Sequence, residues 1–266
     1  SRPMSDFQPR QDQPENKPPQ QDPGAQSAVP SFLRAPKRNK IILTYVLIAV
    51  TVIFYIAQVV VERMVGFDLL FLYLGKINGA ILSGQVWRLI TPVFLHASPL
   101  HLLANMYALY ILGRSNETVN GHLRFSLLYL ISAFGGNVLS FVFGNYPSLG
   151  ASTATFGLLA AEAVFIWQNR EFFPNRGTRN LTNIVMIMVL NLMIGLSAGT
   201  IIDNWGHLGG LIAGLFFAFL AGTRWKIERV DGFPAFVDQR TSKDAWMAFG
   251  LVLLAFVVIA AIPFLL

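Results

Sequence analysis

The chain has 266 residues, of which 54% are hydrophobic and 13% charged, and its mean hydropathy is +0.52. Soluble domains carry nearly twice that charged fraction, so the composition argues against an ordinary soluble globule. The sequence contains no cysteine, which excludes disulfides, thiolate metal sites and cysteine nucleophiles. The formal net charge of +6 is compatible with nucleic-acid binding until the positions of the charges are considered.

The first 39 residues differ in composition from the rest of the chain. They hold eight of the fourteen prolines and six glutamines. Such a stretch buries too little apolar surface to offset its chain entropy, so we expect a disordered tail over 1–39. It does not resemble a secretory signal, because the first apolar run starts only at Ile41 and is too long for the apolar part of a signal peptide.

Seven apolar runs follow the tail, and a membrane-spanning helix needs about 17–25 residues. The second run is short but extends backward over 92–99 without a charge, so we count seven helices. The sequence therefore predicts an all-α polytopic membrane protein with a six-helix core over 40–222, a cytoplasmic linker over 223–243 and an additional transmembrane helix over 244–266. The segment 62–98 is expected to lie in the membrane interface. The runs cover residues 41–61, 100–112, 125–143, 151–167, 181–198, 205–222 and 245–266.

The basic residues set the expected orientation. With the tail inside, the inner segments hold seventeen Lys and Arg and the outer segments hold three, which accounts for all twenty. This predicts a multi-pass protein of the cell membrane with a cytoplasmic N-terminus and an outer C-terminus. The basic residues thus serve as topology signals in contact with the lipid bilayer, and we expect no nucleic-acid partner.

Four polar residues share one layer in this topology. The second, fourth and sixth helices enter from the outer face and begin with His101 and Asn105, Ser152, and His207 respectively. Polar groups at that depth are costly and usually functional. Serine becomes a nucleophile when a neighbouring base takes its proton, and imidazole titrates in the right range, so Ser152 and His207 are a candidate catalytic dyad.

Small residues permit the close approach that this dyad needs. Glycines at four-residue spacing on the sixth helix face small residues on the fourth. The alternative is that Ser152 bonds a carbonyl of its own helix and His207 only caps its helix. The small residues are Gly206, Gly210 and Gly214 on one side, and Gly150, Ala151, Ala154 and Gly157 on the other.

His101 and Asn105 lie four residues apart and project from one helix face. Together with the backbone N–H of Ser152 they are candidates for an oxyanion hole, although an interhelical hydrogen bond that only orders the bundle explains them equally well. We expect His96 to order the segment before this helix and His122 to be solvated.

Two other proteolytic chemistries lack support. The sequence has no H-E-x-x-H motif, so no metal site is predicted, and no cofactor either. An aspartyl protease acting in the membrane would need two aspartates on two different apolar runs, and the sequence has no such pair, so this mechanism is excluded. Glu162 lies about 15 Å of helix rise below Ser152 and is expected to be hydrogen-bonded inside the bundle.

These motifs together resemble the rhomboid intramembrane serine proteases. The resemblance covers roughly residues 40–222, and the seventh helix resembles the family's variant with one extra C-terminal span. It implies Ser152 as nucleophile, His207 as general base, and His101, Asn105 and the Ser152 backbone as oxyanion hole. It also implies that a Trp-Arg pair holds a partly embedded first loop and that substrates are single-span membrane proteins. The motifs are Gly150-Ala151-Ser152 with Gly157, His101-x-x-x-Asn105, Trp87-Arg88, and Gly206-His207-x-x-Gly210-x-x-x-Gly214.

Two positions depart from the family pattern. Thr153 follows the serine where the family usually has glycine, and Phe156 stands where tyrosine is frequent. We expect Thr153 to alter rate or substrate tolerance, and the Phe156 ring to pack on His207. The alternative functions are a catalytically weak or inactive rhomboid-like protein that binds membrane helices, and a small transporter. The transporter would need ionisable groups through the whole membrane depth.

Overall fold

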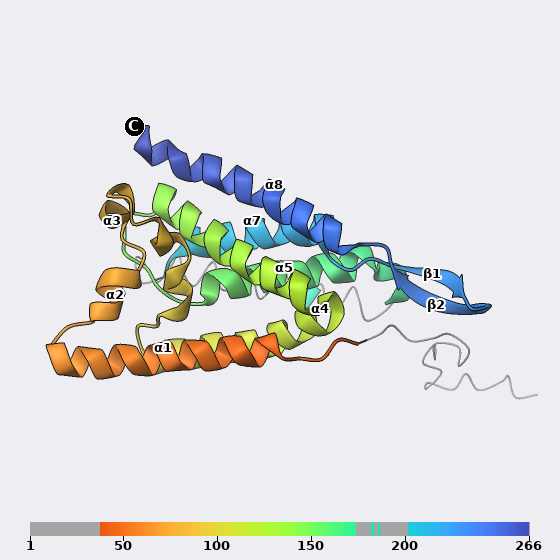
Figure 1. The fold of residues 1–266 in the computed structure, drawn as a ribbon, viewed down its shortest axis with the longest axis horizontal. Helices are drawn as coiled ribbons and strands as arrows, with labels where there is room; N and C mark the ends of the chain where they lie inside the picture. Colours follow the sequence, from red (N-terminus) through yellow and green to blue (C-terminus); the bar gives the residue numbers. More distant parts are fainter. Residues whose placement is uncertain (1–37, 174–181, 184–185, 187–201, 266) are drawn as a thin grey trace, which may run out of the picture.

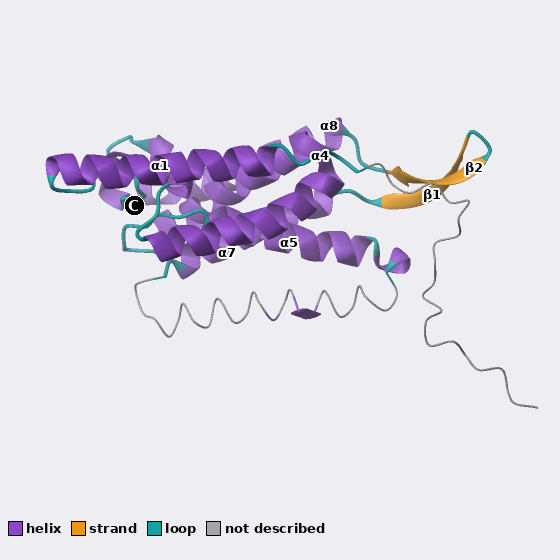
Figure 2. Ribbon diagram, turned by 90° about the horizontal axis from the view of Figure 1, so that it is seen from below, coloured by secondary structure: helices purple, strands orange, loops and turns teal. Residues whose placement is uncertain are grey.

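The computed structural model describes residues 38–173, 182–183, 186 and 202–265. Its long helices run alongside one another, and a β-hairpin projects from one end of the bundle (Figures 1 and 2). The elements are α1 (Leu43–Val65), α2 (Leu69–Leu74), α3 (Asn78–Leu82), the 3₁₀ turns η1 (Val86–Leu89) and η2 (Thr91–Phe94), α4 (Pro99–Phe143), α5 (Ser152–Gln168), η3 (Arg170–Phe172), α7 (Asn204–Ala221), β1 (Trp225–Val230), β2 (Phe233–Asp238), α8 (Ser242–Ala261) and η5 (Ile262–Phe264).

Among the described residues, four helices are long and apolar enough to cross a membrane: α1, α4, α7, and α8 continued by η5. The 17 residues of α5 lie at the short end of the spanning range. These helices confirm the prediction of a mostly helical, polytopic membrane fold. Nearly all of the predicted fifth helix, 181–198, lies outside the described residues, as does the predicted disordered tail up to residue 37.

The second and third predicted helices are the two halves of α4. The backbone leaves the helical conformation at Gly121, with φ 75° and ψ 173°, a region that glycine adopts without steric cost. The two halves meet there at the hairpin end of the bundle (Figure 1). The predicted extension of the second helix back to residue 92 is wrong. Ser98 Oγ accepts the His101 N–H at 3.2 Å, so the helix begins at Pro99 instead.

A carboxylate from α4 caps the start of α1. The side chain of Glu117 is fully buried and accepts hydrogen bonds from the N–H groups of Ile42, Leu43 and Thr44 at 2.9, 2.7 and 2.9 Å. The first N–H groups of a helix have no acceptor inside it. The N-cap residue Ile42 offers no side-chain acceptor, so the Glu117 carboxylate accepts these hydrogen bonds instead. This role of Glu117 was not predicted from the sequence.

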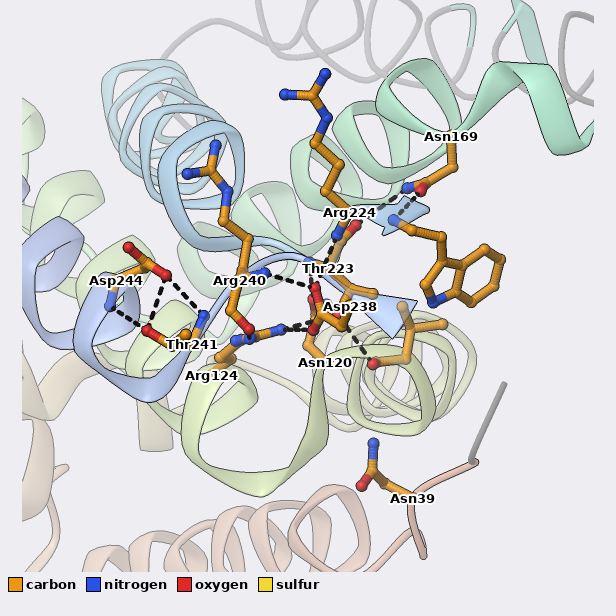
Figure 3. A network of polar contacts seen from close by, with 12 residues as sticks. Asn39, Asn120, Arg124, Asn169, Thr223, Arg224, Asp238, Arg240, Thr241 and Asp244 are labelled. Atoms are coloured by element: carbon orange, nitrogen blue, oxygen red, sulfur yellow. Dashed lines mark hydrogen bonds and ion pairs between the residues drawn. The ribbon is translucent and has the colours of Figure 1, made fainter. Parts of the chain in front are cut away.

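The predicted linker over 223–243 contains an antiparallel hairpin in which Trp225 pairs with Asp238 and Val230 with Phe233. An isolated two-stranded hairpin is only marginally stable in water, so its contacts with the bundle matter. Arg124 supplies several of them: Nη1 donates to Thr223 Oγ1 at 3.0 Å and to Asp238 Oδ2 at 2.5 Å, and Nη2 donates to a backbone carbonyl just before α8 (Figure 3). One side chain of α4 therefore holds both the hairpin and the entry to α8.

Candidate active site

Glycines bring α5 and α7 into backbone contact. A Cβ atom added to Gly210 would lie 2.0 Å from the carbonyl oxygen of Thr153, and one added to Gly214 would lie 2.4 Å from the Cα of Gly157. A Cβ on Gly157 would in turn lie 1.9 Å from Ser132 Oγ on α4. No larger residue fits these positions without moving a helix, so the small residues set the spacing between α4, α5 and α7.

This spacing places Ser152 beside His207. Ser152 is the first residue of α5, His207 lies in the first turn of α7, and His207 Nε2 is 2.9 Å from Ser152 Oγ. The Phe156 ring stacks on the imidazole with a centroid distance of 4.3 Å and an interplanar angle of 8°, as the sequence predicts. The imidazole is 8% exposed, and its buried Nδ1 has no hydrogen-bond partner among the described residues. A hydroxyl and an imidazole thus meet in a largely dry environment.

Asp203 fixes the start of α7. Its Oδ1 accepts the N–H of Gly206 at 2.8 Å, and its Oδ2 accepts a hydrogen bond from Ser140 Oγ on α4. Asp203 was not among the residues predicted for the site. The available signal was an aspartate two residues before the apolar run over 205–222, where an N-cap is typical.

The turn before Ser152 depends on Gly150. This glycine has φ 130°, and a Cβ on it would lie 2.8 Å from His101 Cε1. A side chain there would be both strained and in contact with the imidazole. Gly150 N–H donates to the carbonyl of Pro92 at 2.9 Å, and Ala151 N–H donates to His96 Nε2 at 3.4 Å. The segment before α4 therefore holds the serine turn. His96 was expected to order its own segment, whereas its ring accepts a hydrogen bond from the serine turn.

Burial lowers the pKa of His96 to about 3, with a smaller contribution from neighbouring His101. His96 is therefore neutral at physiological pH. Only a neutral imidazole has a ring nitrogen free to accept the Ala151 N–H.

His101 and Asn105 lie one turn apart on α4. Ala97 N–H donates to His101 Nδ1 at 3.5 Å, which assigns the ring proton to Nε2, the nitrogen that faces Gly150. The Asn105 side chain is 6% exposed and donates to the carbonyl of His101 at 3.0 Å. The structure thus places His101 beside the serine turn, and it gives Asn105 a bond within its own helix.

Trp87 and Arg88 lie in the segment between α1 and α4, residues 66–98, which we term loop 1. Arg88 is buried and donates to the carbonyls of Gly75 and Leu72 at 2.7 and 2.5 Å. Trp87 Nε1 donates to the carbonyl of Tyr73 at 3.1 Å. Both side chains thus connect distant parts of loop 1.

Two further interpretations from the sequence concern residues away from the serine. Glu162 accepts a hydrogen bond from Ser115 Oγ at 2.8 Å inside the bundle, as expected. His122 is solvated as expected, with its ring 45% exposed. Its Nδ1 also lies 2.8 Å from the buried Glu117 carboxylate, a partner that becomes adjacent only when α4 turns at Gly121 and that was not predicted.

Comparison with known proteins places this geometry in a family. The family model described as "Rhomboid domain" matches residues 83–224. Rhomboid protease GluP of Bacillus subtilis is 37% identical over 187 residues, which cover 70% of this chain and 36% of that protein. Rhomboid-like protease 1 of Toxoplasma gondii is 42% identical over 145 residues, 53% of this chain and 48% of that protein.

RHOMBOID-like protein 1 of Arabidopsis thaliana is 40% identical over 137 residues, which cover 51% of this chain and 34% of that protein. The chain spans about a third to a half of the length of these relatives. The family model covers more than half of the chain and includes the serine turn, both histidines of the site and the Trp87-Arg88 pair. The chain belongs to the rhomboid family.

Proposed function

We propose that this protein is an intramembrane serine endopeptidase that uses a Ser152–His207 dyad. The observation that carries the proposal is the 2.9 Å contact between Ser152 Oγ and His207 Nε2 from two helices held together by glycines. A serine within hydrogen-bond reach of an imidazole is the arrangement that activates a hydroxyl. The relatives named as proteases support the same reaction class.

In the proposed reaction, His207 Nε2 takes the proton of Ser152 as Oγ attacks the carbonyl carbon of the scissile peptide bond. The tetrahedral intermediate collapses when His207 returns that proton to the leaving amine, and an acyl-enzyme remains on Ser152. Water then attacks the ester with the same base, which releases the second product and restores the serine. The stacked Phe156 ring keeps the imidazole in plane for both transfers.

The negative charge on the intermediate needs donors that are already in place. Ser152 opens α5, so its backbone N–H has no acceptor inside the helix, and His101 Nε2–H faces the same turn. Asn105 has a second amide N–H beyond the one it gives to the His101 carbonyl. We assign these three donors to the oxyanion hole.

Single-span membrane proteins are the proposed substrates, and cleavage takes place near the outer face of the cell membrane. This follows from the proposed orientation with the N-terminus in the cytoplasm, which the seventeen-to-three distribution of Lys and Arg supports. Ser152 and His207 each lie at the start of a helix rather than at its middle. The substrate helix must therefore unwind near its end to present a peptide bond.

A non-catalytic membrane-helix binding protein is the second candidate, because Thr153 replaces the usual glycine. The Thr153 side chain is 5% exposed, and its Oγ1 is buried without a hydrogen-bond partner among the described residues. A Cβ on Gly136 of α4 would lie 2.6 Å from the Thr153 Cβ, so the threonine occupies the space that this glycine leaves. The turn thus accommodates Thr153 without displacing Ser152.

The experiment that separates the candidates uses the full chain in liposomes with a generic single-span substrate. We expect cleavage by the wild type and none by Ser152→Ala. Ser126→Ala is the matched control, because Ser126 is half-buried and, in the described part of the chain, its hydroxyl bonds only the carbonyl of His122. Equal cleavage by the wild type and Ser152→Ala would refute the protease, and binding of the substrate by both without cleavage would establish the binding protein.

A further inference from the structure

A buried lysine joins loop 1 to the turn that precedes Ser152. Lys76 is fully buried, and its Nζ donates to the carbonyls of Tyr146 and Gly144 at 2.8 and 3.3 Å. Both acceptors lie in residues 144–151 between α4 and α5, which we term loop 3. Lysine is rarely buried without a partner, so the position requires an explanation.

Backbone pairing strengthens this connection. Lys76 and Ser148 exchange N–H to carbonyl hydrogen bonds of 3.0 Å in both directions. Asn78 Nδ2 donates to the carbonyls of Phe141 and Gly144 at 3.1 and 2.8 Å. The path of loop 3 toward Gly150 and Ser152 is thus set by loop 1.

Asp203 extends these polar contacts to α7, the helix that carries His207. Ser140 Oγ donates to Asp203 Oδ2 and lies 3.4 Å from Ser148 Oγ, the residue paired with Lys76. Asp203 also caps α7 through Gly206, the residue before His207. A continuous series of polar contacts therefore runs from Lys76 through Ser148 and Ser140 to the first turn of α7.

The charges around Lys76 are few. Burial lowers the pKa of Lys76 to about 8, and the Asp203 carboxylate opposes that shift. Arg88 lies nearby in loop 1, where it donates to the carbonyl of Gly75. Loop 3 contributes only Tyr146, whose side chain is 59% exposed, and the end of α4 contributes the uncharged Ser140. Among these groups, Asp203 is the one anion, and it acts on the buried ammonium without a direct ion pair.

We propose that Lys76 and Asp203 are positioning residues for the Ser152–His207 pair, one holding loop 3 and the other holding the first turn of α7. The inference rests on the proposed function for its effect on catalysis. The two residues balance one another, so removal of either charge leaves the other uncompensated in a partly buried site. The expected consequence is a displaced dyad in a protein that still folds.

The proposal predicts that stability and cleavage change with pH in opposite directions. If Lys76 served only to stabilise the fold, cleavage would not fall while stability rises. Between pH 8 and the ordinary lysine value of 10.5, the folded protein loses the Lys76 proton while the unfolded chain keeps it. The unfolded state then binds more protons, so the Lys76 contribution to stability rises with pH. Cleavage moves the other way, because the neutral amine no longer balances Asp203. Activity falls as stability increases.

The test compares Lys76→Met, Asp203→Asn and the double variant with the wild type in liposomes between pH 7 and 10. Lys226→Met is the control, because the Lys226 side chain in the hairpin is 61% exposed. We expect each single variant to lower kcat about tenfold at pH 7 with KM little changed, and the double variant to lower it about tenfold rather than a hundredfold. The wild type loses kcat above about pH 8, whereas Lys76→Met lacks this limb.

Amide hydrogen exchange supplies a readout that needs no activity. Lys76→Met is expected to speed exchange at Gly206, which Lys76 does not touch, and Asp203→Asn to speed exchange at Ser148. Unchanged exchange at both positions, a flat wild-type profile to pH 10, or multiplicative losses in the double variant would overturn the proposal. If the wild type cleaves no faster than Ser152→Ala, the proposed function fails, and the exchange data alone decide whether the two residues are linked.

Discussion

The two ends of the bundle are held together by different forces. At the end with loop 1 and the serine, helices meet through glycines and backbone contacts, and the polar side chains, such as Lys76, Arg88 and His207, are mostly buried. At the hairpin end, Arg124, Asp238 and their neighbours form a charged network that reaches from α4 to β2 and α8 (Figure 3). One end therefore fixes Ser152 beside His207, whereas the other end attaches the hairpin and α8 to the bundle.

The largest expected effect follows from removing the base. His207→Ala leaves Ser152 without a proton acceptor, so cleavage falls about 10³-fold. Steady-state cleavage of a single-span substrate in liposomes measures it. His122→Ala at the hairpin end serves as control and changes cleavage little, because His122 contacts only Glu117 there. Substantial activity in His207→Ala would contradict the claim that the end with Ser152 and His207 carries the cleavage reaction.

Arg124→Gln tests whether the hairpin end is energetically separate. The variant loses charge-assisted hydrogen bonds to Asp238, which contribute roughly 1.5–3 kcal/mol. We expect faster amide exchange throughout β1 and β2, while cleavage stays within about twofold of the wild type. Arg229→Gln, on the exposed part of β1, is the control and leaves exchange unchanged. A large loss of cleavage in Arg124→Gln would show that the two ends are coupled.

Gly210→Ala tests the close contact at the site end. The added methyl group would meet the Thr153 carbonyl, so we expect a loss of stability of about 1–3 kcal/mol, measured by thermal unfolding in detergent. Gly250 on α8 has open space around it. Gly250→Ala should therefore leave stability unchanged or raise it by up to about 1 kcal/mol. Similar effects of the two substitutions would contradict the described helix spacing.

The smallest effect is expected at Thr153. Thr153→Val keeps the shape that fills the space beside Gly136 but removes the buried, unpaired hydroxyl, so stability should rise by about 1 kcal/mol and cleavage should change by less than about threefold. Thr153→Gly opens the turn and should change kcat more than Thr153→Val does. If Thr153→Val abolishes cleavage, the hydroxyl has a role that the contacts do not reveal.

The sequence predicted the site end far better than the hairpin end, and the reason is physical. Helical periodicity makes the glycines at four-residue spacing recognisable in the sequence. Because the helices of Ser152 and His207 are predicted to enter from the same membrane face, the starts of both helices are expected at similar depth. Glu117 and Arg124 act on partners 73 and 114 residues away, which no local pattern encodes. Asp203 caps its own helix, which a local pattern does indicate, but its bond with Ser140 joins residues 63 positions apart. The hairpin was also missed, because its strands are short: the apolar-polar alternation of β1 covers only residues 225–228, and β2 contains Pro234.

The central claim is that His207 activates Ser152, and the most direct measurement is covalent labelling of the intact protein in liposomes with a fluorophosphonate, followed by mass spectrometry of the labelled peptide. The predicted result is a single adduct on Ser152 in the wild type, with the labelling rate reduced about a hundredfold or more in His207→Ala. Labelling of a different residue, or an equal rate at Ser152 without His207, would contradict the claim.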